Sequence, residues 1–214
     1  MTGCFPFRRR PLRGVCQFAA ALWFGLAALT PLPAIADPDT SPRAACLAAV
    51  RAAEARHGLP DSLLVAIALA ESGLHAHALN IGGTAHYPQR VDEARRLLAE
   101  APTGASLMIG CLQVNGRVHA RSTDWALDPV RAADWAARYL RRHHADHGGD
   151  WVAAVSRWNG GSRQQRQRLI CRVQAILAEL TPETDVLSHA ACPPAELARA
   201  ARDGRALLIR AEGS

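Results

Sequence analysis

Glu71 is the residue whose position most directly predicts chemistry. It follows the apolar run of residues 63–70 and precedes Ser72 and Gly73. A helix that is apolar on all sides is normally buried, so this carboxyl is expected where a buried helix ends at an opening. Burial raises the pKa of a carboxyl, and the negative end of a helix dipole acts in the same direction. We therefore predict that Glu71 stays protonated near neutral pH and serves as a general acid. The alternative is a surface glutamate in the last turn before a glycine cap.

Two further segments contain polar residues that could bind a sugar. Residues 110–115 read Gly-Cys-Leu-Gln-Val-Asn, and residues 154–161 read Ala-Val-Ser-Arg-Trp-Asn-Gly-Gly. Behind Glu71-Ser72, their order resembles that of the soluble lytic transglycosylase (SLT) domain of the lysozyme-like superfamily. That family shows Glu-Ser at a helix end, then Gly-Leu-Met-Gln, then Ala-x-x-Tyr-Asn-x-Gly. The resemblance covers about residues 45–161, and the chain looks like the small transglycosylases that accompany conjugation and secretion machines.

The resemblance implies a mainly α, lysozyme-like helical domain with a small irregular or β element near the active site. It also implies cleavage of the MurNAc–GlcNAc bond of peptidoglycan without a cofactor. Glu71 would first protonate the leaving oxygen. It would then take the proton of the muramyl C6 hydroxyl, which attacks the anomeric carbon and closes a 1,6-anhydro ring. One carboxyl suffices because the nucleophile belongs to the substrate, whereas ordinary glycosidases use two.

The same resemblance assigns the substrate-binding residues. Gln113 and Asn115 would line the groove, although backbone capping in a tight segment is an alternative role for both. Ser72 would orient Glu71 or the backbone near it. Asn159 would contact the sugar or hold its loop, and Trp158, which stands where the family has Tyr, would stack on a sugar near Glu71. The family Leu-Met pair is replaced by Cys111 and Leu112, which are expected inside the groove.

Two alternative functions remain open on the sequence. One is a hydrolytic muramidase on the same fold, which would produce no anhydro ends. The other is a catalytically weak factor that binds the cell wall and assists assembly of a conjugation or secretion complex. The replacement of the family Tyr by Trp158 favours this second alternative, because an indole lacks a phenolic oxygen.

The first 36 residues are typical of a cleaved signal peptide. Four arginines precede an apolar stretch, and Ala34-Ile35-Ala36 is a small-x-small cleavage pattern. Pro31 and Pro33 disfavour the alternative of an uncleaved membrane anchor. The protein is therefore expected in the periplasm, with peptidoglycan glycan strands as its partner. The formal charge of +6 falls to about +2 without these four arginines (21 basic minus 19 acidic residues), which disfavours a nucleic-acid partner.

Four cysteines remain after residue 36, and an exported protein can form disulfides between them. We expect Cys46 to pair with Cys171, because the entry and exit segments of a compact helical domain often meet. Cys111 and Cys192 would pair or stay free. The His75-x-His77 and His143-His144-x-x-His147 groups lack acidic or cysteine partners in a known metal pattern, so no metal site is predicted.

The remaining pattern predicts a helical domain over residues 37–180 and an extension, a loop and a helix, over residues 181–214. Ser41-Pro42 and Asp128-Pro129 are helix-start signals, and Trp135 is expected on the buried side of the second of these helices. Further helices are expected over about 61–71, 91–101, 150–158, 164–180 and 195–209. Residues 106–115 could form strand or helix, and a loop is expected around Asn80 and Gly82-Gly83.

Overall fold

The computed structural model describes residues 41–121, 123–158 and 160–213. The described part contains the helices α1 (Pro42–His57), α2 (Leu63–Ser72), α3 (Val91–Ala99), α4 (Pro129–Asp146), α5 (Trp151–Trp158), α6 (Arg163–Leu180) and α7 (Pro194–Glu212). It also contains a 3-10 turn, η1 (Trp125–Leu127), and the strands β1 (Leu79–Ile81), β2 (Thr84–His86), β3 (Leu107–Ile109) and β4 (Val114–Asn115). The mainly α, lysozyme-like fold predicted from the sequence is confirmed. The predicted signal peptide lies outside the described residues, as does Asn159.

The predicted helix starts are confirmed by their capping bonds. The Ser41 hydroxyl accepts a hydrogen bond from the backbone N–H of Ala44, at 3.2 Å, ahead of α1. The Asp128 carboxylate accepts from the N–H groups of Val130 and Arg131 ahead of α4. In both cases a side-chain oxygen satisfies backbone donors that the first helical turn leaves free.

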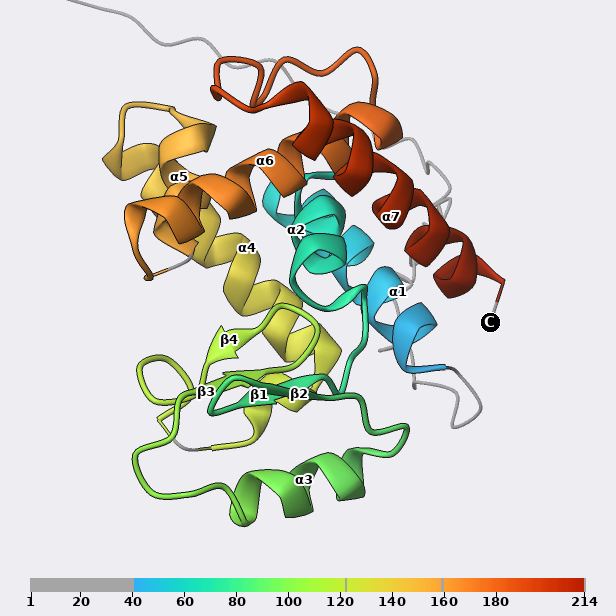
Figure 1. Cartoon of the computed structure of the whole chain (residues 1–214), viewed down its shortest axis with the longest axis vertical. Helices are drawn as coiled ribbons and strands as arrows, with labels where there is room; N and C mark the ends of the chain where they lie inside the picture. Colours follow the sequence, from blue (N-terminus) through green and yellow to red (C-terminus); the bar gives the residue numbers. More distant parts are fainter. Residues whose placement is uncertain (1–40, 122, 159, 214) are drawn as a thin grey trace, which may run out of the picture. The chain divides into compact units, whose positions relative to one another are not determined.

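The strands form one small antiparallel sheet in the order β2-β1-β3-β4, with α3 beside it (Figure 1). The segment 106–115, expected as strand or helix, supplies β3 and β4. The loop expected around Asn80 is instead the β1–β2 hairpin, turned at Gly82 and Gly83, whose φ values of +59° and +93° favour glycine. Strands of three residues carry too little alternation to be recognised from the sequence.

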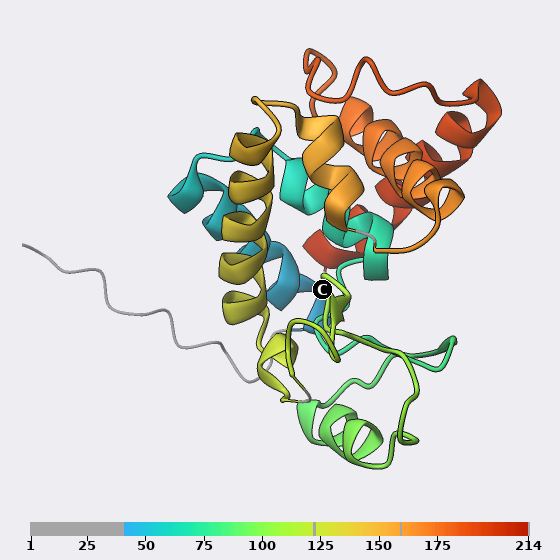
Figure 2. The ribbon, with the colours of Figure 1, turned by 90° about the vertical axis from the view of Figure 1, so that its left-hand side faces the viewer.

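Helix α2 lies inside the helical part of the fold, in contact with α1, α4, α6 and α7 (Figures 1 and 2). Its residues 63–69 are all buried. The helix starts without a side-chain cap of its own, because Ser62 has a left-handed backbone (φ +64°). Glu54 of α1 takes this role, since its Oε1 accepts from the N–H of Leu64 at 2.6 Å and of Val65 at 3.0 Å. The buried Glu54 carboxyl group thus satisfies two free backbone donors at the start of α2.

The disulfide pairing differs from the expected one. Cys46 bonds to Cys111, with a Cα–Cα distance of 6.3 Å, and Cys171 bonds to Cys192, at 5.4 Å. The predicted Cys46–Cys171 bond is wrong, because α1 packs against α2, α4 and α7 whereas α6 packs against α2, α5 and α7. The Cys46–Cys111 bond fastens the Gly-Cys-Leu-Gln segment to α1, and the Cys171–Cys192 bond fastens the chain ahead of α7 to α6.

Helix α7 packs against α6, α1 and α2. Gly204 lets it approach α6 closely, since a Cβ at this position would lie 2.6 Å from Cγ1 of Ile176. A salt bridge of 2.7 Å joins Arg51 of α1 to Glu212 near the end of α7. The C-terminal extension therefore forms one wall of the helical part. Within the part of the chain that the structure describes, no helix is long and apolar enough to cross a membrane.

Candidate active site

Glu71 occupies the last turn of α2, one residue before the helix ends. Gly73 caps this end in the left-handed conformation (φ +62°), and its N–H donates to the carbonyls of Ala68 and Leu69. The Glu71 side chain is half-buried. Burial raises its pKa from the ordinary value of 4.5 to about 7, and the positive charge of Arg172 acts in the opposite direction. The raised pKa expected from the sequence is therefore present, with burial as its main cause.

A cavity of about 330 Å³ surrounds the exposed part of Glu71. The end of α2 forms one side of it. The other sides come from α1, from the loop after β2 and from the α6–α7 wall, with the lining residues Arg43, Tyr87, Arg172, Ile176, Ala200, Asp203, Gly204 and Leu207. The carboxyl that can give up a proton near neutral pH thus faces a space that a substrate group can enter.

Ser72 connects the end of α2 to the second motif. Its hydroxyl donates to the carbonyl of Cys111, at 2.7 Å, and accepts from the backbone N–H of His75, at 3.1 Å. The Cys46–Cys111 bond holds the same turn from the α1 side. Ser72 therefore fixes the backbone that follows Glu71 and sets its distance from the Gly-Cys-Leu-Gln segment.

The turn at Gly110 requires glycine. Its φ is +75°, and a Cβ there would lie 2.0 Å from the carbonyl oxygen of Ala126. Gln113 follows in a left-handed conformation (φ +46°) and is 9% exposed. Its Nε2 donates to the carbonyl of Gly110 at 2.9 Å and lies 3.4 Å from that of Ala78. In this structure the Gln113 amide therefore holds its own turn together, the alternative role considered for it.

The other residues of this segment also have structural contacts. The Asn115 Oδ1 accepts from the N–H groups of Arg117 and Val118, at 3.0 and 3.1 Å, and so shapes the turn after β4. Cys111 and Leu112 are both fully buried. The expectation that they lie inside the groove is wrong, because they point into the core under the segment.

Trp158 ends α5 and belongs to a half-exposed group of rings. Its ring centroid lies 5.6 Å from that of Tyr139 and 5.9 Å from that of Trp135. Trp135 also contacts Trp125, at 5.7 Å, and His119, at 4.9 Å. We call these five residues the aromatic cluster. Trp158 is not among the residues that line the Glu71 cavity, so its closeness to Glu71 stays a prediction.

Trp135 and Tyr139 are the site candidates that sequence reasoning missed. Both are half-buried rather than buried in the core. The Tyr139 hydroxyl donates to the carbonyl of Arg157, at 3.0 Å, which ties α4 to the end of α5. Their i, i+4 spacing places both rings on one face of α4. That spacing was visible in the sequence, but only the position of α5 shows that this face meets Trp158.

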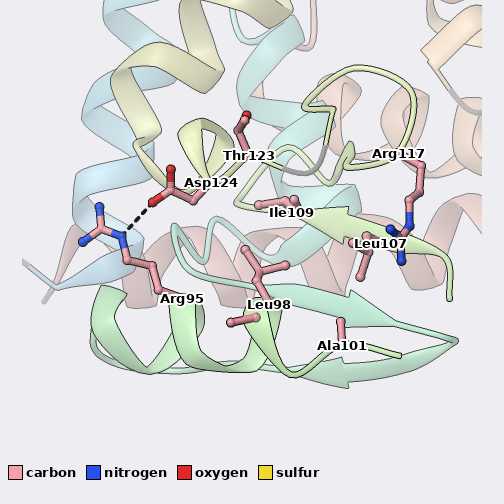
Figure 3. Close-up of a pocket in the computed structure, with 9 residues that line it drawn as sticks. Arg95, Leu98, Ala101, Leu107, Ile109, Arg117, Thr123 and Asp124 are labelled. Atoms are coloured by element: carbon pink, nitrogen blue, oxygen red, sulfur yellow. Dashed lines mark hydrogen bonds and ion pairs between the residues drawn. The ribbon is translucent and has the colours of Figure 1, made fainter. Parts of the chain in front are cut away.

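A larger cavity, of about 480 Å³, lies between α3 and β3 (Figure 3). Leu98 and Ala101 approach Leu107 and Ile109 there, and none of the predicted site residues lines it. Its carboxylate, Asp124, is bonded to Arg95 at 2.8 Å, and this bond lowers the pKa of Asp124. An ionised, paired carboxylate cannot act as a general acid near neutral pH, so we assign the active site to Glu71.

Among residues 41–121, 123–158 and 160–213, no group of three or more His, Cys, Asp or Glu side chains is placed to hold a metal ion. His75 of the His75-x-His77 pair is 2% exposed. Burial lowers its pKa to about 4, so its imidazole is neutral near pH 7.

Comparison with known proteins gives a family but no individual relative. No curated protein and no solved structure matches the chain. The Glu71 helix end, the Gly-Cys-Leu-Gln turn and all of α5 fall inside one matched region, residues 48–170, which is more than half of the 214 residues. The model matched there is that of the transglycosylase SLT domain, and the chain therefore belongs to this family of peptidoglycan lytic transglycosylases.

Proposed function

We propose that this protein is a periplasmic lytic transglycosylase that cleaves the MurNAc–GlcNAc bond and leaves a 1,6-anhydromuramyl end. The observation that carries the proposal is the Glu71 carboxyl. It has a pKa of about 7 and faces a cavity at the end of a buried helix, in a domain of the SLT family. A group with this pKa is protonated in about half of the molecules at pH 7 and can both give and accept a proton.

In the proposed mechanism Glu71 acts twice. The protonated carboxyl donates its proton to the glycosidic oxygen as the bond from that oxygen to the anomeric carbon breaks. The resulting carboxylate takes the proton of the muramyl C6 hydroxyl, whose oxygen bonds to the same anomeric carbon. Glu71 ends the cycle protonated, and no water is consumed. In the free protein, the positive charge of Arg172 favours the carboxylate form of Glu71.

The aromatic cluster supports binding of a glycan strand. Its rings are half-exposed, and Asn115 of the second motif accepts a backbone hydrogen bond from His119 at 2.9 Å. Aromatic faces beside polar groups suit the apolar faces and hydroxyl groups of sugar rings. We assign Trp158, Trp135 and Tyr139 to this binding surface. Asn159, outside the described residues, would complete it.

Hydrolysis by a muramidase mechanism is the second candidate function, and one feature favours it. Asp203 of α7 lines the same cavity as Glu71. Two carboxyls beside one sugar are the equipment of an ordinary glycosidase. Asp203 lies on α7, beyond the matched region, whereas Glu71 lies inside it. The transglycosylase mechanism, which needs Glu71 alone, therefore has the stronger support.

The cellular setting is also a proposal. The predicted signal peptide and the two disulfides agree with an exported protein. A periplasmic enzyme of this kind would open the wall locally for a conjugation or secretion apparatus, because the sequence resembles the small transglycosylases that accompany such machines.

Mass spectrometry of muropeptides tests the reaction. Residues 37–214 are purified in oxidised form and incubated with peptidoglycan, alongside the Glu71→Gln and Asp203→Asn variants. We expect anhydromuramyl products from the wild type and from Asp203→Asn, and at least about 100-fold less from Glu71→Gln. Products with reducing muramyl ends from the wild type, absent with Asp203→Asn, would instead indicate a hydrolytic muramidase. Binding to peptidoglycan without any cleavage would indicate the assembly factor.

A further inference from the structure

The Glu71 cavity contains two guanidinium groups that differ in their contacts. Arg43 of α1 donates from its Nη1 to the carbonyl of Gly73 and so belongs to the α2 cap. Arg172 of α6 is exposed, and no salt bridge joins it to a carboxylate of the described residues. Its charge acts on Glu71 from across the cavity. Arg172 is thus the cation of this site that has free hydrogen-bond donors.

The other titratable groups of the cavity do not neutralise Arg172. They are Asp203 of α7, which is exposed, and Tyr87 of the loop after β2, which is 54% exposed. Asp203 also forms no salt bridge with a described residue. The rim beside the general acid therefore offers a guanidinium to solvent and to any anion that enters.

We propose that Arg172 binds a carboxylate carried by the substrate next to the scissile bond, and that this ion pair loads the proton onto Glu71 in the enzyme–substrate complex. The inference rests on the proposed function and names what this cavity recognises. Peptidoglycan carries carboxylates close to the scissile bond, on the lactyl arm of the muramyl unit and on the stem peptide. A planar guanidinium matches a carboxylate with two parallel hydrogen bonds.

The coupling between binding and protonation follows from charge. In the free protein Arg172 lowers the pKa of Glu71 and so favours its carboxylate. A substrate carboxylate on Arg172 cancels this effect and adds its own negative charge, and both changes favour protonated Glu71. By linkage, the protonated enzyme also binds the anionic substrate more tightly. Glu71 is then protonated, and able to act as the general acid, when a cleavable strand is bound.

Arg172 lies two residues beyond the matched region 48–170, on the α6–α7 wall. This wall also carries Asp203 and Leu207, and the Leu207 methyl groups lie about 3 Å from where a Cβ on Gly73 would stand. The contact that we propose is therefore supplied by a residue outside the matched region, close to motif residues that lie inside it.

Steady-state kinetics on soluble glycan fragments with stem peptides test the proposal. The fragments are compared with the same fragments after amidation of their carboxylates, and with peptide-free fragments that carry only the lactyl carboxylate. The enzymes are the wild type, Arg172→Gln, Arg172→Lys and the control Arg141→Gln, an exposed α4 position outside the cavity. Arg172→Gln should raise KM for the charged fragment by about 3–10-fold, the effect of one exposed but hydrogen-bonded ion pair. Arg172→Lys should recover part of this loss, and Arg141→Gln should match the wild type.

The pH profiles provide the second readout. For the wild type, the alkaline limb of kcat should lie at higher pH than that of kcat/KM, because kcat reports the complex and kcat/KM the free enzyme. Arg172→Gln should move the kcat/KM limb to higher pH and bring the two limbs together. Amidated fragments should bring them together on the wild type as well. If the peptide-free fragment still binds, the partner of Arg172 is the lactyl carboxylate. If its binding is lost, the partner is a carboxylate of the stem peptide.

Binding by the inactive enzyme separates this inference from the proposed reaction. The dissociation constant of Glu71→Gln for the charged fragment should increase about 3–10-fold when Arg172→Gln is added, and the amidated fragment should show no such increase. Equal affinities in the two backgrounds, or a KM unchanged by Arg172→Gln while the pH limb moves, would overturn the substrate contact. Loss of anhydro products with this binding pattern intact would refute the transglycosylase proposal alone.

Discussion

Glu71→Gln removes the titrating carboxyl and keeps nearly the same side-chain shape. We expect the variant to be inactive and yet more stable than the wild type at neutral and alkaline pH. The reason is that a half-buried carboxylate without a close ion pair is costly in the folded state. A gain in stability on removing this carboxyl would show that the catalytic residue lowers the free energy of unfolding of the protein.

The magnitude follows from the pKa. In the folded protein the Glu71 pKa is about 7, against an ordinary value of 4.5. Each pKa unit corresponds to about 1.4 kcal/mol, so the difference of about 2.5 gives roughly 3.5 kcal/mol as an upper limit. Because the folded state binds the proton more tightly, the contribution of Glu71 to stability is complete below pH 4.5 and is lost as the pH rises through 7. Wild type and variant should therefore be similar at pH 4 and differ by up to roughly 3.5 kcal/mol at pH 8.

Urea unfolding of the oxidised proteins at pH 4, 6 and 8 measures this difference. Burial also raises the pKa of Glu54 to about 7, but Glu54 is present in both proteins and cancels in the comparison. Glu93→Gln, an exposed position on α3, controls for loss of a surface charge. Parallel stability curves for wild type and Glu71→Gln across this pH range would refute the reasoning, because Glu71 would then titrate as an ordinary carboxyl.

Three further predictions concern the scaffold and the glycan surface. Gly110→Ala should destabilise by roughly 3 kcal/mol from backbone strain and the clash with Ala126, whereas Gly148→Ala, where nothing lies within 4 Å of the new Cβ, should cost only about 1–2 kcal/mol; thermal unfolding of both variants compares them. Breaking the Cys46–Cys111 bond with Cys111→Ser should cost about 4 kcal/mol in the chain-entropy model for a separation of 65 residues, and lytic activity should fall with it; full activity in the folded variant would contradict the role of this bond at the site. Trp158→Tyr should retain or raise the rate of lysis, whereas Trp158→Ala should lower it about 10-fold or more because the aromatic ring that stacks on the sugar is lost; equal rates in the two variants would remove Trp158 from the binding surface.

The sequence by itself determined the features that depend on neighbours along the chain. The caps at Ser41 and Asp128, the all-apolar α2 and the position of Glu71 at its end are local patterns, because helix periodicity and capping act within one or two turns. The raised pKa of Glu71 was predictable for the same reason, since a carboxyl at the end of a buried helix is desolvated wherever that helix packs.

Only the tertiary structure decided which distant segments meet. The choice of Cys111 over Cys171 as partner of Cys46 depends on which helices flank α1. The capping of α2 by Glu54, and the approach of Arg172 and Asp203 to Glu71, likewise join residues that no local period relates. Such contacts are set by the packing of whole helices, where the free energy is shared among many small apolar contacts. No single residue type signals them in the sequence.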